Sequence, residues 1–371
     1  MRQHKQFFLP NFHNCYHGGI HSAKDHTLVK IDFSSNINPL GISDNVIKSL
    51  KKNIHLSYIY PDPNCTELKK DILKHLDCSI DESHNIIIGN GATELIHYFS
   101  SSFVKKNTII PSPTFCEYEL ASRRKGAKIT YSKVKKDFQI NSEFIIKNSN
   151  NPNNDITTIF LCNPNNPTGK DSKNQVIEVL EKIDKKIIIL LDESYVEFIN
   201  DKQKKRSNYF INLIKEYNNI VIIRSLTKTW GLAGLRVGYA VSNKKIVDKM
   251  KNHIIAWNVN GLAQIAAREA LKDKEYLKNT KEIIEIEKEK CFKRLGKNDK
   301  IKLVHTDVNF YLIEILNDKN STEIKDTLLN KNNLLVRDCK TFTGMNNKFI
   351  RVAIKKSQEN NELFKGLEKV L

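Results

Sequence analysis

The chain has 371 residues, of which 40% are hydrophobic, and a formal net charge of +18. This length suits two domains or one large α/β domain with a smaller one attached, and the hydrophobic content excludes wholesale disorder. The longest apolar runs, such as residues 186–192, have the length of a strand and fall short of the roughly 20 residues that cross a membrane. The N-terminus lacks the apolar stretch of a signal peptide, so a soluble cytoplasmic protein is expected.

The positive charge and the seven cysteines each admit two interpretations. Basic residues are spread along the chain and do not cluster around aromatic residues, so a bias of composition explains the charge better than a nucleic-acid-binding surface. The cysteines are odd in number, widely scattered and without a C-x-x-C pair, which favours reduced thiols over a disulfide framework or a zinc site. We therefore expect small anionic partners rather than nucleic acid.

The segment "YHGGIHSAKD" at residues 16–25 comes before any run with the pattern of a core element. Gly18 and Gly19 let backbone N–H groups approach an anion, and His17 adds a donor, so the segment is a candidate binding loop. The alternative is a structural turn. The two glycines also interrupt the helix that a metal site built from the nearby histidines needs, so no metal is expected.

Short apolar runs alternate with helical patterns, such as residues 92–104 and 172–183, from about residue 60 to residue 260. This alternation predicts a largely parallel sheet with helices on both faces. After residue 262 a long charged helix at 274–295 precedes three further strand patterns, which predicts a smaller α+β domain. The predicted strands are residues 85–89, 107–113, 157–163, 186–193, 219–226 and 236–242 in the first part, and 308–315, 333–339 and 348–354 in the second.

Three of the predicted strand ends carry groups suited to an anion or a charged ring. One strand ends in the glycines of residues 89–91, after which Ala92 and Thr93 open a helix whose N–H groups can hold a phosphate; a tight turn is the alternative. The Asn- and Pro-rich stretch at 161–170 is a rigid, hydrogen-bonding turn. Asp192 closes a buried strand where α/β sheets bind ligands, and it could pair with a protonated ring nitrogen or cap the next helix.

Lys228 follows another strand in an otherwise apolar, glycine-containing segment. An ammonium group is costly to bury there, so the pKa of Lys228 should fall, as an amine nucleophile requires. Ser225 and Arg236 could hold an anion beside it. The alternative is a surface lysine and an arginine in a structural ion pair.

The order of these groups along the chain resembles that of fold-type I pyridoxal-phosphate enzymes, and the chain resembles the class I/II aminotransferase superfamily over essentially its whole length. The resemblance implies an α/β large domain with a mostly parallel seven-stranded sheet at 51–262 and a small α+β domain at 263–371. It also implies an N-terminal arm with a substrate loop at 1–50, packing with the small domain. Pyridoxal 5'-phosphate is the implied cofactor, in a homodimer in which Tyr60 reaches the phosphate of the neighbouring subunit's cofactor.

The same resemblance implies roles for individual residues. Lys228 would bind the cofactor covalently and move the proton at Cα, and Asp192 would hold the ring nitrogen. Asn166 and Tyr195 would hydrogen-bond the phenolic oxygen, and Phe115 would stack on the ring. The cofactor phosphate would be held by Ala92, Thr93, Ser225 and Arg236.

Two families of this superfamily share two C-terminal arginines with the chain: histidinol-phosphate aminotransferases and the threonine-phosphate decarboxylases of cobamide biosynthesis. Arg351 matches the arginine that binds the substrate α-carboxylate, and Arg337 is a second anion site suited to a phosphate. The alternative is that Arg337 pairs with Asp338 or another acid. By resemblance, the residues that contact the substrate are His17, Gly18, Asn36, Asn166, Arg337 and Arg351.

Segments outside the shared cofactor site resemble the decarboxylases more than the aminotransferases; they are residues 17–19, 32–41, 257–267 and 337–342. The resemblance implies decarboxylation of O-phospho-L-threonine to (R)-1-amino-2-propanol phosphate. A histidinol-phosphate aminotransferase is the nearest alternative, and a basic nucleic-acid-binding protein on an enzyme-like fold is an alternative of another class.

Overall fold

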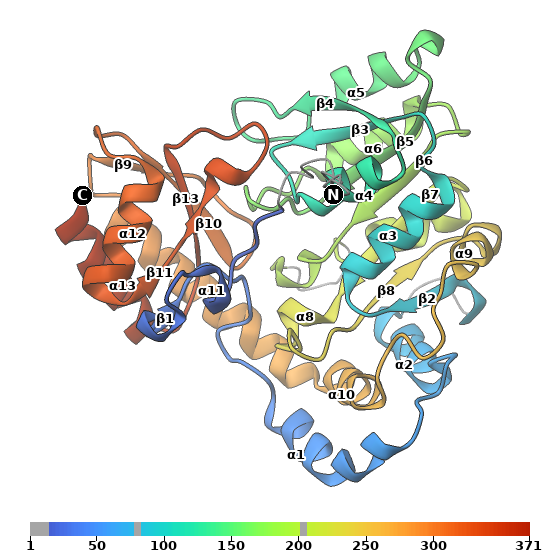
Figure 1. Ribbon diagram of the computed structural model, residues 1–371, viewed down its shortest axis with the longest axis horizontal. Coiled ribbons are helices and arrows are strands. Elements are labelled where there is room, and N and C mark those ends of the chain that lie inside the picture. The colour runs from blue at the N-terminus through green and yellow to red at the C-terminus, as the bar shows by residue number, and fades with distance from the viewer. Residues whose placement is uncertain (1–14, 78–82, 201–205) are drawn as a thin grey trace, which may run out of the picture.

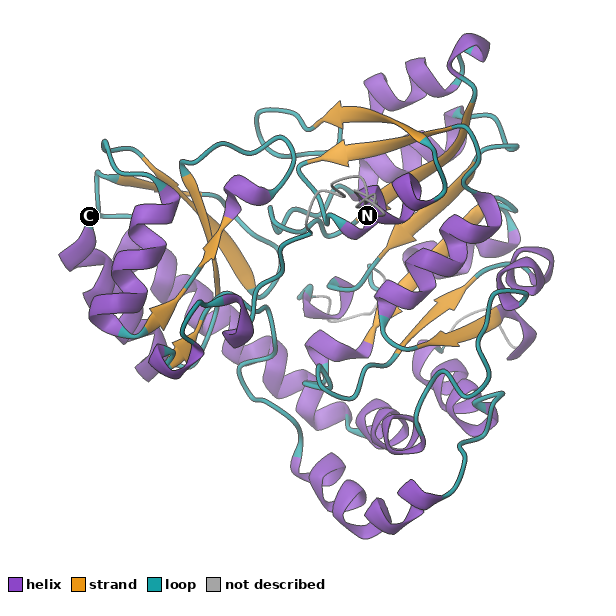
Figure 2. Ribbon diagram, viewed as in Figure 1, coloured by secondary structure: helices purple, strands orange, loops and turns teal. Residues whose placement is uncertain are grey.

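The apolar runs of the first 260 residues form one seven-stranded sheet in the computed structural model, which describes residues 15–77, 83–200 and 206–371 (Figures 1 and 2). The strand order is β2-β8-β7-β6-β5-β3-β4, and β8 runs in the opposite direction to the other six strands. The prediction of a mostly parallel sheet is confirmed. The strands are β2 (Ile86–Gly89), β3 (Asn107–Ser112), β4 (Lys128–Lys133), β5 (Ile156–Cys162), β6 (Ile188–Asp192), β7 (Ile220–Ser225) and β8 (Gly238–Val241).

Helices cover both faces of this sheet, because alternate residues of each buried strand face opposite sides. On β6, Leu190 packs with α3, α4 and α9, whereas Ile189 and Leu191 pack in the core formed with α2, α5, α6 and α10. The helices on the first face are α3 (Ala92–Phe103), α4 (Glu117–Arg124) and α9 (Lys244–Lys251); those on the second are α2 (Thr66–Leu76), α5 (Ser142–Ser149), α6 (Lys173–Lys182) and α10 (Gly261–Lys272).

The second part of the chain forms a four-stranded antiparallel sheet with the order β12-β13-β10-β9. Three helices pack on it around a separate apolar core that includes Phe310 and Leu363. The predicted smaller α+β domain is therefore confirmed. Its elements are α11 (Lys274–Leu295), β9 (Ile301–Leu303), β10 (Phe310–Ile315), α12 (Ser321–Asn332), β12 (Arg337–Asp338), β13 (Phe349–Ala353) and α13 (Ser357–Val370).

The N-terminal arm connects the two domains. Its strand β1 (Ile31–Asp32) pairs in parallel with β11 (Leu334–Leu335) of the small domain, whereas α1 (Asp44–Asn53) packs against α10. Residues of α10 belong to the core of the large sheet, so this core continues beyond residue 262. The domain division at residues 50 and 262 stays a prediction.

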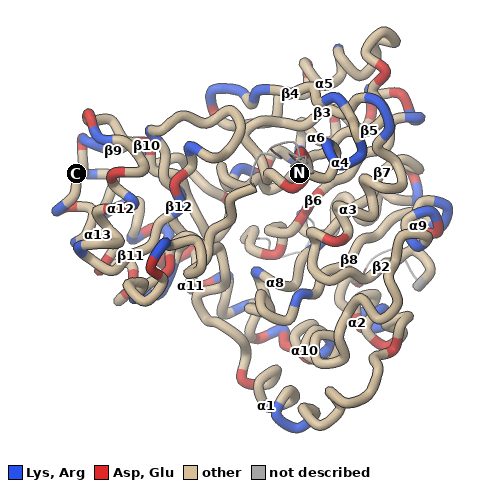
Figure 3. The backbone as a smooth tube through the Cα atoms, viewed as in Figure 1, with Lys and Arg blue, Asp and Glu red and all other residues tan. Residues whose placement is uncertain are grey.

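Lys and Arg are spread over both domains, interspersed with acidic residues (Figure 3). None of the helices in the described part of the chain is long and apolar enough to cross a membrane.

Candidate active site

A cavity of about 540 Å³ lies where β5, β6 and β7 end, bounded by the large domain, the N-terminal arm and the small domain. Ligands of open α/β sheets bind at the carboxyl ends of the strands, where a crevice forms. All but one of the residues predicted for the site line this cavity, Tyr60 being the exception. The predicted residues that line the cavity are His17, Gly18, Asn36, Ala92, Thr93, Phe115, Asn166, Asp192, Tyr195, Ser225, Lys228, Arg236, Arg337 and Arg351.

Asp192 ends β6 as a buried carboxylate in the cavity wall. Its Oδ2 accepts a hydrogen bond from the Tyr118 hydroxyl at 2.7 Å, and its Oδ1 accepts one from the Ser194 N–H at 2.8 Å. Burial raises the pKa of Asp192, because a charged carboxylate is costly to remove from water. Both hydrogen-bond donors are uncharged, so a protonated pyridine nitrogen would supply the missing positive charge, and this end of the cavity fits a pyridoxal ring.

Lys228 lies in α8 (Leu226–Thr229), the short helix that follows β7. Its pKa is lowered to about 8, chiefly by burial and further by the positive charges of Arg351 and Arg236. Near neutral pH, a fraction of such amines is uncharged, which a nucleophile or a proton carrier needs. The predicted fall in the pKa of Lys228 is confirmed.

The amino end of α3 shares the cavity wall with a guanidinium group and two hydroxyl groups. Gly91 precedes this helix with a φ of 79°, and a Cβ atom there would lie 2.4 Å from the Arg236 guanidinium, so glycine is required. The Ser225 hydroxyl lies 2.6 Å from that of Thr227, a residue that sequence reasoning missed. Helix N–H groups, hydroxyls and a guanidinium form a donor set that fits the phosphate of pyridoxal 5'-phosphate.

Asn166, Tyr195 and Asn36 are buried on the side of the cavity next to the small domain. Arg351 donates a hydrogen bond to the side-chain oxygen of Asn166, and the Tyr195 ring packs edge-on against Phe310 with 5.0 Å between ring centres. The Tyr195 hydroxyl lies 3.3 Å from Asn36 Nδ2, and burial raises the Tyr195 pKa to about 12. Asn36 Oδ1 is buried without a hydrogen-bond partner among the described residues, so a ligand would satisfy it.

Arg337 and Arg351 lie directly opposite one another on β12 and β13. Both side chains are buried, with 8% and 5% of each residue exposed. Arg337 donates to the Tyr16 carbonyl at 2.6 Å, and Arg351 donates to the Ser34 carbonyl at 2.5 Å. Burial lowers both pKa values, and the charge of Arg351 helps to lower that of Arg337 to about 10. Two adjacent buried cations favour a ligand with two anionic groups.

The nearest acid on the same strand does not neutralise Arg337. The Asp338 carboxylate turns toward α12, where it accepts hydrogen bonds from the hydroxyls of Ser321 and Thr322 at 2.7 Å each. The alternative interpretation, an ion pair between Arg337 and Asp338, is therefore wrong. Arg337 remains available to an anion in the cavity.

The N-terminal arm reaches the cavity at His17. His17 Nε2 lies 3.1 Å from one oxygen of Glu117 at the start of α4, and His97 Nε2 lies 3.2 Å from the other oxygen. These two contacts lower the pKa of Glu117 to about 2. A Cβ atom on Gly18 would lie 2.3 Å from the Ser34 carbonyl oxygen, so the close approach of the two segments requires glycine. Glu117 and His97 were missed by sequence reasoning, since no local pattern marks them.

Cys15 and Cys116 form a disulfide at this edge of the cavity, so the prediction that the cysteines are reduced is wrong for this pair. The pairing was invisible in the sequence because the two residues are 101 positions apart. The other described cysteines are buried free thiols, and Cys78 lies outside the described residues. His17 brings a ring nitrogen within 4.8 Å of both sulfurs, but bonded sulfurs are not thiolates, so this state offers a metal no thiolate ligand.

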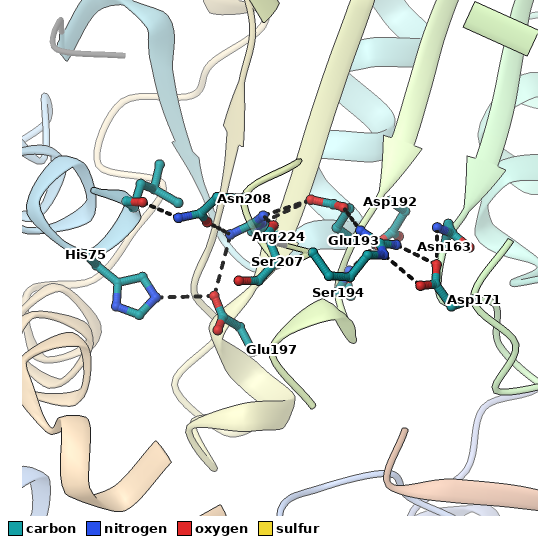
Figure 4. A network of polar contacts seen from close by, with 12 residues as sticks. His75, Asn163, Asp171, Asp192, Glu193, Ser194, Glu197, Ser207, Asn208 and Arg224 are labelled. Atoms are coloured by element: carbon teal, nitrogen blue, oxygen red, sulfur yellow. Dashed lines mark hydrogen bonds and ion pairs between the residues drawn. The ribbon is translucent and has the colours of Figure 1, made fainter. Parts of the chain in front are cut away.

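A buried ionic network of Asp171, Glu193, Arg206 and Arg224 lies beside the strand ends (Figure 4), and these four residues are not part of the cavity lining. Glu193 follows Asp192 and points to the opposite face of the sheet. Arg224 donates to Glu193 at 2.9 Å, and Arg206 lies 3.3 Å from Glu193 and 2.6 Å from Asp171. Because the network fixes the ends of β6 and β7, it positions Asp192 without reaching into the cavity.

Tyr60 lies on the surface, with 76% of the residue exposed and its ring stacked on Trp257 at 4.5 Å between centres. Tyr58 and Ile255 beside them are also largely exposed. Exposed large apolar side chains in one place are typical of a surface that another chain covers. The role of Tyr60 at a neighbouring subunit's site stays a prediction.

Comparison with known proteins gives a matching family model, two similar relatives and a similar solved structure. The family model for class I and II aminotransferases matches residues 29–367. A protein of Caldanaerobacter subterraneus subsp. tengcongensis, provisionally named threonine-phosphate decarboxylase, is 34% identical over 357 residues, which cover 95% of this chain and 92% of the relative. The histidinol-phosphate aminotransferase of Methanocaldococcus jannaschii is 33% identical over 346 residues, covering 92% of this chain and 89% of the relative. The crystal structure of the histidinol-phosphate aminotransferase from Clostridium acetobutylicum matches with a TM-score of 0.83 at 32% identity, covering 92% of this chain and 98% of that one.

Proposed function

The chain belongs to the class I and II aminotransferase family, with pyridoxal 5'-phosphate as its cofactor, and we propose that it decarboxylates O-phospho-L-threonine to (R)-1-amino-2-propanol phosphate for cobamide biosynthesis. The observation that carries this proposal is the pair of buried arginines, Arg337 and Arg351, side by side in one cavity. O-Phospho-L-threonine has a carboxylate and a phosphate that are separated only by Cα, Cβ and an ester oxygen. It therefore offers one anionic group to each arginine, and the name of the Caldanaerobacter relative supports the same substrate.

In this proposal Arg351 binds the α-carboxylate, and Arg337 binds the phosphate together with His17. The guanidinium groups of Arg351 and Arg337 donate to uncharged backbone carbonyls, those of Ser34 and Tyr16 respectively. An anionic acceptor makes a stronger, charge-assisted hydrogen bond with a guanidinium than a carbonyl does. The substrate is therefore expected to displace these two contacts.

Pyridoxal 5'-phosphate supplies the electron sink for charge that develops at Cα of the substrate. The residues of the chain decide which bond at Cα breaks, because fixing the carboxylate and the phosphate at the same time fixes the rotation of Cα. Carbon dioxide leaves, and the electron pair of the broken bond stays behind. Lys228, with a pKa of about 8, is mostly protonated near neutral pH when it is not covalently engaged and can then deliver a proton to Cα.

The second candidate is a histidinol-phosphate aminotransferase, because a relative and a solved structure with that name match the chain about as well as the Caldanaerobacter relative does. Histidinol phosphate has a phosphate for Arg337 but no carboxylate for Arg351. In that reaction Arg351 would bind the carboxylate of the second substrate, 2-oxoglutarate. The two candidates therefore share the arginines and differ in the products.

Product identification tests the proposal. The purified enzyme with its cofactor is incubated in parallel with O-phospho-L-threonine, O-phospho-L-serine, and histidinol phosphate plus 2-oxoglutarate. We expect carbon dioxide and aminopropanol phosphate from the first substrate. Glutamate formation from histidinol phosphate, without carbon dioxide from O-phospho-L-threonine, would replace the decarboxylase by the second candidate.

We also propose a homodimer in which the exposed surface around Tyr60 and Trp257 is covered and Tyr60 reaches the cofactor phosphate of the partner. The stacked, exposed rings support this arrangement. Light scattering should give twice the chain mass, and Tyr60→Phe should weaken cofactor binding while His55→Ala, a nearby exposed substitution, should not. A monomeric enzyme that binds cofactor tightly would contradict this proposal.

A further inference from the structure

The disulfide between Cys15 and Cys116 joins two segments of the cavity wall that lie far apart in the sequence. Cys15 begins the substrate loop, which we define as residues 15–19. Cys116 stands between Phe115 and Glu117, and both of these residues line the cavity. Because both cysteines are partly exposed, small reagents can reach the bond. The bond ties the substrate loop to the wall beside the predicted cofactor ring.

The other described cysteines are poor competitors for a redox reagent. The reactive form of a cysteine is the thiolate, and burial in apolar surroundings suppresses it. Burial raises the pKa of each of these thiols, to about 11 for Cys65 and to about 12 for Cys162, Cys291 and Cys339. Among the described cysteines, thiol–disulfide exchange is therefore directed to Cys15 and Cys116.

The disulfide differs from the other attachments of the substrate loop in that the substrate does not compete with it. Arg337 and His17, which make two of the noncovalent attachments, are the residues proposed to bind the substrate phosphate. When a phosphate binds to these two side chains, their contacts no longer attach the loop to the wall, whereas the disulfide remains. The polar attachments among the described residues are Arg337 Nη2 to the Tyr16 carbonyl at 2.6 Å, His17 to Glu117 at 3.1 Å, and the Gly19 N–H to the Ser34 hydroxyl at 2.8 Å.

We propose that Cys15 and Cys116 are a thiol–disulfide exchange site that sets how firmly the substrate loop holds a phosphorylated substrate. In the oxidised enzyme the disulfide holds the loop in place before the phosphate binds. Binding therefore does not have to offset the free-energy cost of ordering the loop. In the reduced enzyme the loop is free to move, so it must be ordered when the substrate binds, and the free-energy cost of this ordering weakens binding. The effect on substrate rests on the proposed function, whereas the exchange site itself does not.

The exchange is balanced with a low-molecular-weight disulfide, such as glutathione disulfide, as the oxidant. One cysteine thiolate attacks a sulfur of the reagent, and a glutathione thiolate leaves. The second cysteine then attacks the mixed disulfide and expels the other glutathione. The protein gives up two electrons and two protons, and the reagent becomes two thiols; excess thiol drives the reverse reaction.

The test compares oxidised and reduced enzyme, each with its cofactor bound. Oxidation by glutathione disulfide is verified by mass spectrometry of a non-reduced digest, and reduction is performed with a dithiol. We expect the KM for O-phospho-L-threonine to rise about tenfold on reduction with little change in kcat. Amide hydrogen exchange of residues 16–19 should also become faster, and this measurement does not depend on the identity of the substrate.

Two variants control the comparison. Cys116→Ser should have the KM of the reduced enzyme in both conditions, with Cys15→Ser as the second version if the first folds poorly. Cys291→Ala, which removes a buried thiol of α11, should keep the full redox response. A digest without the Cys15–Cys116 link, or equal loop exchange in both redox states, overturns the exchange-site proposal. If neither state turns over O-phospho-L-threonine while the link and the exchange difference are found, the proposed function fails and the exchange site stands.

Discussion

Replacing Arg337 by methionine is expected to leave the free energy of unfolding nearly unchanged. The substitution removes two hydrogen bonds, to the Tyr16 carbonyl at 2.6 Å and the Thr341 hydroxyl at 2.8 Å, whose loss costs about 2–4 kcal/mol. Against this loss, burial and the charge of Arg351 lower the Arg337 pKa from 12.5 to about 10, which corresponds to about 3 kcal/mol against the charged form. The two effects nearly cancel, so the net change should stay within about 2 kcal/mol.

The same substitution is expected to damage catalysis strongly. Methionine fills much of the space of arginine but donates no hydrogen bond, so the substrate phosphate would lose its guanidinium partner. Removing one partner of a buried charged pair costs about 3 kcal/mol, which corresponds to roughly 100-fold in kcat/KM. The loss should appear with O-phospho-L-threonine, and the absorbance spectrum of the bound cofactor should not change.

Arg224 provides a matched control, because it is also buried but is paired with an acid. It lies on β7 and donates to Glu193 at 2.9 Å. Arg224→Met leaves Glu193 without its main partner, and this should cost about 3–5 kcal/mol of stability. Denaturant unfolding and steady-state kinetics of both variants test the contrast. If Arg337→Met unfolds several kcal/mol more easily and keeps its kcat/KM, Arg337 has a structural role and the proposed phosphate site is wrong.

Three further predictions concern Lys228, Tyr118 and Glu117. The rate at which cofactor-free enzyme takes up pyridoxal 5'-phosphate should rise with pH and level off above the Lys228 pKa of about 8, because the uncharged amine is the nucleophile; a flat profile in stopped-flow absorbance would argue against this. Tyr118→Phe removes the 2.7 Å hydrogen bond to Asp192 and should weaken cofactor binding about tenfold in equilibrium dialysis, whereas unchanged affinity would mean that Asp192 needs no such support. Glu117 has its pKa lowered from 4.5 to about 2, so its carboxylate stabilises the fold above pH 4.5 and this contribution disappears as the pH falls toward 2. Glu117→Gln should therefore cost about 3 kcal/mol near neutral pH and progressively less in acid, and a pH-independent difference in urea unfolding would contradict this.

The fold was predictable where burial leaves a continuous apolar run, and less so where it does not. Strand β6 is apolar along its length because both faces of the sheet are covered, so the pattern found it. Strand β4 at the sheet edge was missed because most of its residues are partly or fully exposed. The antiparallel direction of β8 was also missed, since an apolar run carries no information about direction.

The candidate site was predictable where single residues stand at strand ends. Asp192 and Lys228 follow buried strands, and a charged residue in such a place is informative by itself. Glu117 and His97 were missed because their significance lies in contacts with distant segments, and the same holds for the Cys15–Cys116 disulfide. A contact between residues 101 positions apart depends on the packing of the arm on the large domain, which no local pattern encodes.

The residues that fit the cofactor and the residues proposed to bind the substrate come from different parts of the fold, and this bears on which reaction the enzyme performs. The groups that fit the cofactor come from the strand ends and helices of the large domain, as Asp192, Lys228 and Arg236 illustrate. Most of the groups proposed for the substrate come from the arm and the small domain, as His17 and Arg337 illustrate. Because the two sets lie on different parts of the fold, substitutions in the arm or on β12 can change which bond at Cα breaks without disturbing the cofactor. We therefore expect the difference between decarboxylation and amino transfer to follow the arm and the small domain, and not the shared strand ends of the large sheet.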